Sequence, residues 1–450
     1  MDFCDIATDS AESHIPMERI LKRISLFLLV FSGTLAGAQN TISVDVDFYT
    51  RGELRRGGLP NTEEEGGSGN DHANFVSERT RMGFVYNGQG LAAKLTAQHS
   101  GIWGSKEGGS FNVFEAWVRL SSKAGFFAQV GRQNISYDDQ RIFGSDNWSM
   151  TGISHDALRV GFEGKGHKLH LIGAYNQNAE NTKGGTFYTG GLQPYKAMET
   201  LWYHYDIPKT NLGISLLLTD IGMQGGEKGK TEKIYREILY GAYLNYTPEH
   251  WTAEAAYYRQ TGKNEYAIPV DAWMASAKLT FSPQTTFTGY AGYDYLSGDD
   301  QFATPPFGAV GMAQHTKIKG FSSLYGSHHK FYGAMDFFYV TTYRGGFSPG
   351  LQNAFAGFTW RPHEKFTADF AYHFLATATH LENAEKPLGH EVELSASYDL
   401  RKDTKLSIGY TFMKGTETMV VLKRTDENRR LHWAWITLWV TPKLLNASLK

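Results

Sequence analysis

Apolar and polar residues alternate along most of the chain after residue 40. In residues 41–55, for example, Ile42 and Val44 alternate with Ser43 and Asp45. Successive side chains of a β-strand point to opposite faces, so this period of two predicts strands with one apolar and one polar face. The same pattern recurs in later segments, among them 91–98, 114–120, 365–374 and 390–400.

The lengths of the connections distinguish a membrane barrel from a soluble sandwich, which would show the same alternation. Eight short, turn-like connections alternate strictly with nine longer, polar, glycine-rich ones. An opening strand near 41–55, eight hairpins and a closing strand near 431–441 give 18 strands. An even strand number, with short turns at one end and long loops at the other, is typical of bacterial outer-membrane barrels. The short turns are at residues 87–90, 121–125, 164–167, 208–211, 247–250, 282–285, 361–364 and 401–403.

The predicted fold is therefore all-β, a transmembrane antiparallel up-and-down β-barrel formed by residues 39–450. A sheet that spans lipid must be closed, because every backbone polar group needs a partner there. The apolar faces then meet lipid and the polar faces line the lumen, so Phe114 is expected outside and Glu115 inside. Residues 297–348 form a very long, aromatic-rich outer connection that we expect to fold into the pore.

Residues 1–38 are predicted to be a signal peptide region, with Met17 as an alternative start. The segment from Met17 has a basic start, a short apolar run and a small-residue cleavage site. A retained membrane anchor is the alternative. The only cysteine, Cys4, lies in the removed part, so no disulfide is expected. Residues 1–38 hold five of the 46 acidic and three of the 44 basic residues, so the remainder carries equal numbers of both. This neutrality gives no reason to expect a nucleic-acid partner.

Seven basic residues fall on the polar parity of early strands and would face the pore. Guanidinium groups bind planar carboxylates bidentately, and rings of such groups in a narrow pore favour anions. Glu115 would hold basic neighbours in place, and Trp117 would stack on a sugar face. The alternative role for each arginine is to brace the wall. The seven residues are Arg51, Arg55, Arg79, Arg81, Lys94, Arg119 and Arg159.

The segment "GRQNISYDDQRIFG", residues 131–144, concentrates charge where a strand passes into an outer loop. With the residues after it, the segment resembles the core of the alginate-export family of outer-membrane barrels. The glycine that the family has before its aspartate is replaced here by Asp138. The matching residues are Gly131, Arg132, Gln133, Tyr137, Asp139, Arg141, Gly144, Trp148 and Asp156.

The resemblance implies an 18-stranded monomeric barrel with an arginine-lined constriction, which in the family's namesake selects an anionic uronate polymer. It adds Arg132, Gln133, Asp139, Arg141 and Asp156 to the candidate pore-lining residues. The alternative for the charged members is a clamp that folds the outer loop into the pore.

We therefore expect an outer-membrane channel for anionic solutes, such as an alginate-like or other acidic polysaccharide or oligosaccharide. A general diffusion porin and a glycan-binding adhesin are the alternatives. Expected partners are outer-membrane lipid and lipopolysaccharide, an anionic saccharide or other small anionic solute, and the barrel-assembly machinery.

No cofactor, metal or enzymatic activity is expected. Ser154, His155 and Asp156 are strand neighbours that point to alternating faces, so they cannot form a catalytic relay among themselves. The pairs His328-His329 and Asp299-Asp300 lack the spacing of a metal site.

Overall fold

A computed structural model describes residues 40–56, 72–299, 316–338, 348–381, 384–423 and 430–449. The predicted signal peptide region and much of the 297–348 connection lie outside the described residues. No helix among the described residues is long and apolar enough to cross a membrane.

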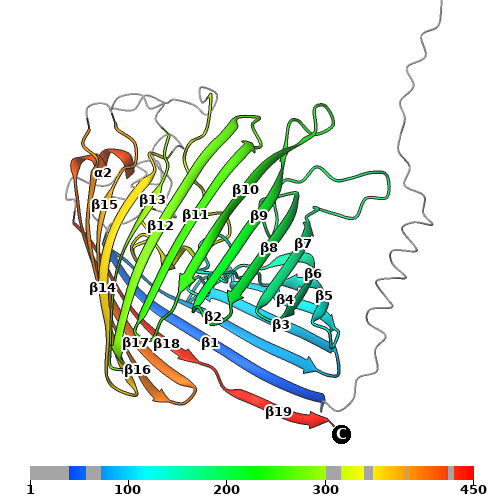
Figure 1. Cartoon of the computed structure of the whole chain (residues 1–450), viewed down its shortest axis with the longest axis horizontal. Coiled ribbons are helices and arrows are strands. Elements are labelled where there is room, and N and C mark those ends of the chain that lie inside the picture. The colour runs from blue at the N-terminus through cyan, green and yellow to red at the C-terminus, as the bar shows by residue number, and fades with distance from the viewer. Residues whose placement is uncertain are drawn as a thin grey trace, which may run out of the picture.

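Antiparallel strands account for most of the described chain (Figure 1). Two short helices join them: the 3-10 helix η3 (His328–Lys330) and α2 (Glu417–Lys423). The strands are β1 (Asn40–Arg56), β2 (His72–Asn87), β3 (Leu91–Ile102), β4 (Ser110–Ser121), β5 (Phe126–Gln133), β6 (His155–Gly164), β7 (His167–Tyr175), β8 (Ala197–Ile207), β9 (Leu212–Gly225), β10 (Lys233–Tyr246), β11 (Trp251–Lys263), β12 (Pro269–Gln284), β13 (Phe287–Leu296), β14 (Leu351–His363), β15 (Phe366–Ala376), β16 (Pro387–Arg401), β17 (Thr404–Gly415), β18 (Arg430–Val440) and β19 (Lys443–Leu449).

The strands form one closed ring, because each strand from β1 to β17 pairs with the next strand in the sequence and β1 also pairs with β18 and β19. Strands β18 and β19 share one position in the ring, which therefore has 18 positions. The short turns gather at the lower end of the barrel in Figure 1 and the longer connections at the upper end. The predicted 18-stranded up-and-down barrel is confirmed.

The closing strand is longer than predicted and is interrupted at Pro442. Proline cannot donate a ladder hydrogen bond, but its carbonyl still accepts one from the Val46 amide at 3.1 Å. Two tryptophans of β18 turn inward, where the Trp433 indole donates to Glu53 and the Trp439 indole to Asp47, each at 3.0 Å. Aromatic residues on the lumenal face explain why both faces of this strand look apolar in the sequence.

The outer surface of the barrel is apolar, as alternation predicts. Leu95, Val130 and Leu158 are about half exposed. Leu95 and Val130 each lie on the face of their strand opposite to a buried polar neighbour, and Leu158 lies opposite to the inward-facing Arg159. Such a band on a closed barrel is the surface that contacts lipid.

Phe114 departs from the predicted parity. The register of β3 against β4 shifts so that Thr96 pairs with Glu115 and Ala97 with Val113, which leaves Phe114 without a partner. This irregularity turns Phe114 inward, where the Arg81 guanidinium lies 3.6 Å from its ring centroid. The expectation that Phe114 faces lipid is therefore wrong.

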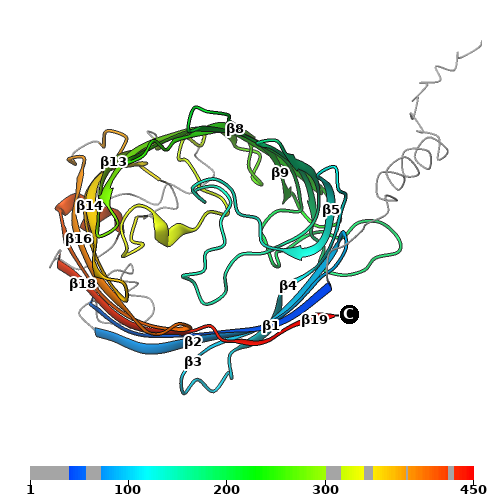
Figure 2. The same ribbon diagram turned by 60° about the horizontal axis from the view of Figure 1, so that its bottom comes forward.

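Two connections lie inside the ring: residues 134–154, and residues 316–338 of the long outer connection (Figure 2). They contact each other through the backbone, because the Gly144 amide donates to the Tyr325 carbonyl at 2.9 Å and the Tyr325 amide to the Ile142 carbonyl at 3.1 Å. We call them the first inner loop (134–154) and the second inner loop (316–338).

The second inner loop is also fixed to an acidic part of the wall. Glu393 accepts a hydrogen bond from the Ala334 amide at 2.7 Å, and Glu391 accepts one from the Met335 amide at 2.9 Å. Many of the residues buried with these loops are apolar or aromatic, so the packed core lies within the lumen.

Candidate pore constriction

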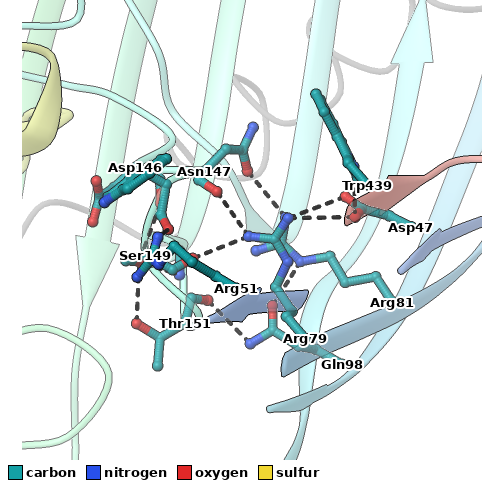
Figure 3. Close-up of polar contacts among 12 residues, drawn as sticks. Asp47, Arg51, Arg79, Arg81, Gln98, Asp146, Asn147, Ser149, Thr151 and Trp439 are labelled. Atoms are coloured by element: carbon teal, nitrogen blue, oxygen red, sulfur yellow. Dashed lines mark hydrogen bonds and ion pairs between the residues drawn. The ribbon is translucent and has the colours of Figure 1, made fainter. Parts of the chain in front are cut away.

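Arginines of β1 and β2 hold the backbone of the first inner loop (Figure 3). Arg51 donates to the Trp148 carbonyl at 2.9 Å. Arg79 donates from one nitrogen to the carbonyls of Asn147 (2.9 Å) and Ser149 (3.0 Å). Because both arginines are buried and charged, their hydrogen bonds to carbonyl oxygens fix the loop strongly.

Side chains of β2 and β3 extend this grip along the loop. Arg81 donates to the Asn147 side-chain oxygen at 3.0 Å and to Gln98 at 2.6 Å. Gln98 in turn donates to the Thr151 carbonyl at 3.1 Å. Together the two strands set the position of residues 147–151 across the lumen.

Carboxylates of β1 neutralise the arginines that hold the loop. Glu53 accepts from Arg51 at 2.7 Å and from Arg55 at 2.8 Å. Asp47 lies 3.3 Å from Arg79. These three arginines line the lumen, each is ion-paired with a carboxylate, and Arg51 and Arg79 also donate to loop carbonyls, so their main contribution is to shape the constriction.

The two inner loops meet at Trp148. Its ring stacks on the His329 imidazole at 4.0 Å between centroids, and the Arg51 guanidinium lies 4.2 Å from the Trp148 ring. His329 Nδ1 is itself hydrogen-bonded to the Asp336 carboxylate at 2.9 Å. A cation–π contact and ring stacking therefore join the barrel wall to both loops.

Arg141 connects the first inner loop to the opposite wall. It pairs with Asp139 in the same loop at 3.0 Å and with Asp294 of β13 at 3.2 Å. It also donates to the Tyr332 hydroxyl at 2.7 Å and to Ser276 at 3.0 Å. Burial alone would lower the pKa of Arg141. The nearby Asp294, Tyr332 and Asp139 raise it by more, so the pKa lies well above its ordinary value and the guanidinium stays charged. Arg141 and Asp139 thus form a clamp between loops and wall.

Asp138 adopts the left-handed backbone conformation, with φ of 53°, at the position where the family has glycine. Its carboxylate accepts hydrogen bonds from the Trp202 indole at 3.2 Å and the Ser215 hydroxyl at 2.5 Å. Aspartate tolerates this conformation better than most residues do. The turn geometry is therefore kept, and the new carboxylate ties the loop to β8 and β9.

Arg132 and Asp156 do not line the pore. Strand β5 continues to Gln133, so Arg132 shares the outward parity of the exposed Val130 and Asp156 that of Leu158. The two form a bidentate pair at 2.9 and 2.8 Å on the outer surface. Their expected pore-lining position is wrong, because ordinary strand alternation extends further than the motif suggests.

Gln133 faces inward and braces the wall. It is fully buried, and its amide donates to the carbonyls of Ala157 (2.9 Å) and Gly131 (3.2 Å). It therefore has no exposed surface for a solute.

A cavity of about 780 Å³ lies between the first inner loop and the short-turn end of β1–β6. Five basic side chains and three carboxylates line it, together with Trp117. Unlike Arg51 and Arg79, its cations have few backbone partners. The basic residues are Arg81, Lys94, Arg119, Arg159 and Lys443, and the acidic ones are Asp45, Asp47 and Glu115.

Neighbouring groups position the basic residues of the cavity. Lys94 is ion-paired with Glu115, Arg119 lies 3.3 Å from Glu163, and Arg159 donates to Gln129 at 3.0 Å. The Trp117 indole donates to Glu115 at 3.2 Å.

Arg81 is almost completely buried, with 6% of its surface exposed. Its Nη2 atom is itself buried and has no hydrogen-bond partner.

The other polar candidates have structural contacts. His155 is bonded to the Tyr195 hydroxyl at 2.9 Å, whereas Asp156 points outward, so the two form no relay. The Asp299 carboxylate accepts hydrogen bonds from the backbone amides of Lys319 (2.6 Å) and Gly320 (3.2 Å) and thereby fixes the second inner loop. Within the described residues, no group of three or more His, Cys, Asp or Glu side chains is placed to hold a metal ion.

Sequence reasoning missed the residues on the far wall that receive the inner loops. Asp294, Ser276, Glu391 and Glu393 all lie on the polar parity of their strands, which is the only sequence signal they carry. Their partners are loop residues far away in the sequence, so no local pattern identifies the contacts.

Comparisons with known proteins agree with this architecture. The profile of the family described as "Alginate export" matches residues 105–419. No curated protein sequence matches the chain. Among solved structures, the chain is similar to OpdL of Pseudomonas aeruginosa (TM-score 0.59, 11% identity, covering 90% of this chain and 99% of that one). It is also similar to OccAB2 of Acinetobacter baumannii (TM-score 0.59, 11% identity, 90% and 98% covered). At these identities the likeness concerns the fold alone.

Proposed function

This chain belongs to the alginate-export family of outer-membrane channels, and from that premise we propose that it passes anionic solutes, with acidic saccharides as the preferred class. The observation that carries the proposal is the cavity beneath the first inner loop, where five cations face three carboxylates. An excess of fixed positive charge in a narrow, partly dehydrated space attracts anions and repels cations.

The cavity combines the two kinds of contact that an acidic sugar needs. Arg81, Arg119 and Arg159 supply guanidinium groups that bind carboxylates in fixed geometry. Trp117 supplies an indole at the same level, and such a ring packs against the apolar face of a pyranose. Carboxylates such as Glu115 limit the depth of the electrostatic well, so that a bound solute leaves again.

The arginines differ in their roles because they have different hydrogen-bond partners. Arg51, Arg79 and Arg141 hold loops and set the width of the passage, whereas Arg119 and Arg159 contact the solute. Arg81 lines the cavity and also holds Asn147 of the first inner loop. We further propose that the barrel functions as a monomer and that the barrel-assembly machinery inserts it.

Block of single channels by oligouronates tests the proposal. We expect uronate oligomers to interrupt the current, and neutral oligomers of the same length to do so only weakly. Arg119→Ala should weaken uronate block by about tenfold or more, because one charge-assisted hydrogen bond contributes about 1.5–3 kcal/mol. Arg259→Ala, on the outer surface, is the control and should leave the block unchanged. Equal block by charged and neutral oligomers would contradict the proposal.

A further inference from the structure

Charged residues on the outer surface of the barrel gather near the outer ends of the strands, and three of the arginines there are ion-paired. Besides the Arg132–Asp156 pair, Arg236 of β10 lies 2.6 Å from Glu199 of β8. Further along, Asp271 of β12 is ion-paired with Arg259 of β11 at 2.8 Å. These three outward-facing arginines therefore have carboxylate partners.

The outer ends of β16, β17 and β18 carry a different arrangement, which we call the rim patch: His390, Lys414, Arg430 and His432. All four lie on the outward parity of their strands. In the register, His390 is opposite Lys414, and Lys414 is opposite Arg430. Among the described residues, no carboxylate forms an ion pair with Lys414 or Arg430.

This arrangement is unfavourable unless an anion joins it. Like charges directly opposite each other on one face of a sheet repel and destabilise the pairing. A counter-anion placed over Lys414 and Arg430 would remove that repulsion.

Next to the charges of the rim patch lie four aromatic side chains, which we call the aromatic base: Tyr372, Phe374, Tyr410 and Phe412. The Tyr372 hydroxyl is hydrogen-bonded to His390 Nδ1 at 2.6 Å, and the Tyr410 hydroxyl to His432 Nδ1 at 2.7 Å. Phe374 packs against His390 with 5.2 Å between ring centroids, and Phe412 likewise against His432 with 5.1 Å. Each imidazole therefore keeps Nε2 as its remaining polar atom, beside apolar surface that faces the membrane.

We propose that the rim patch binds the phosphorylated headgroup of an outer-leaflet glycolipid, with its acyl chains lying on the aromatic base. Three features specify this occupant: cations that have no carboxylate partner within the described parts of the chain and that suit phosphate, a position at the outer interface, and adjoining aromatic surface on the lipid side. A soluble anion would not use the aromatic surface, and an apolar protein partner would leave the cations unpaired. The proposal concerns the outer wall and does not depend on which solute the lumen passes.

The test is binding of purified bisphosphorylated lipid A to the full-length, refolded barrel in detergent, measured by native mass spectrometry. Lys414→Gln combined with Arg430→Gln should weaken binding by about tenfold or more, since each basic residue near an anionic lipid surface contributes about 1 kcal/mol. The matched control is Arg236→Gln combined with Arg259→Gln, two outward-facing arginines that already have carboxylate partners. We expect this control to bind lipid A as the unmodified barrel does.

Two further arms keep the outcome decisive. Dephosphorylated lipid A should bind weakly to all variants, because only the apolar contact remains. A change of electrophoretic migration on heating reports that the unheated variant was folded, because heating unfolds the barrel. If the double variant fails to fold, Lys414→Gln alone replaces it. Equal binding of lipid A by the rim-patch and control variants would overturn the proposal, as would equal binding of the phosphorylated and dephosphorylated lipids.

Discussion

The Arg141 guanidinium lies 3.2 Å from the Asp294 carboxylate, so a residue of the first inner loop is ion-paired with the far wall of the barrel. Both side chains are almost completely buried. A pair of this kind holds the loop across the lumen, and the passage on either side takes its width from that position.

Replacing Arg141 with alanine should release the first inner loop. Removal of one partner leaves the Asp294 carboxylate buried and uncompensated, which costs about 3–5 kcal/mol. We expect a larger and noisier single-channel conductance and faster proteolysis within residues 134–154. Arg259→Ala breaks an exposed pair and should change neither. An unchanged conductance in a folded Arg141→Ala barrel would show that the clamp does not set the constriction.

Replacing Arg79 with lysine should loosen residues 147–151 even though the charge is kept. One guanidinium nitrogen reaches the carbonyls of Asn147 and Ser149 while another faces Asp47, and an ammonium group cannot reproduce that fork. A spin label at Ser149 should therefore become more mobile in the Arg79→Lys barrel. The label should keep its mobility when Arg236, which lies on the outer surface, is replaced by lysine. Equal mobility in both variants would argue against the fork as the element that holds the loop.

The docking of the first inner loop should depend on pH through Asp138. Burial is the main cause that raises the pKa of this carboxyl above its ordinary value of 3.8, and hydrogen bonds from Ser215 and Trp202 only partly oppose it. A group with a raised folded-state pKa contributes most when protonated, so its contribution is complete below pH 3.8 and declines as the pH rises through the folded-state pKa. Asp138→Asn should remove this component, which differential scanning of both proteins across acidic pH would measure. Parallel pH profiles would contradict the assignment.

Alternation alone predicts the barrel and the face of most strand residues, because one lipid-facing side constrains each strand. It fails at Phe114, where a register irregularity between β3 and β4 turns a residue that the pattern assigns to lipid. At Arg132 alternation gives the correct outward face and the family motif does not, because strand β5 continues to Gln133.

The contacts of the constriction are harder to predict than its residues. Arg51 and Arg79 carry a parity signal, but the carbonyl oxygens that they bind belong to a loop with no periodicity. Arg141 depends on Asp294 and Tyr332, which lie far away in the sequence and meet it only when the barrel closes. Asp138 looks like a defect in a glycine turn until its φ of 53° and its hydrogen bonds to the wall are known.

The most direct test of anion selectivity is the reversal potential of single channels in a salt gradient. We predict that the reversal potential of the unmodified barrel is shifted from zero toward the equilibrium potential of the anion. Joint replacement of Arg81, Arg119 and Arg159 by glutamine should move the reversal potential toward zero or past it. The same number of substitutions on the outer surface, at Arg132, Arg236 and Arg259, should leave it in place. A barrel that is unselective or cation-selective before any substitution would contradict the account.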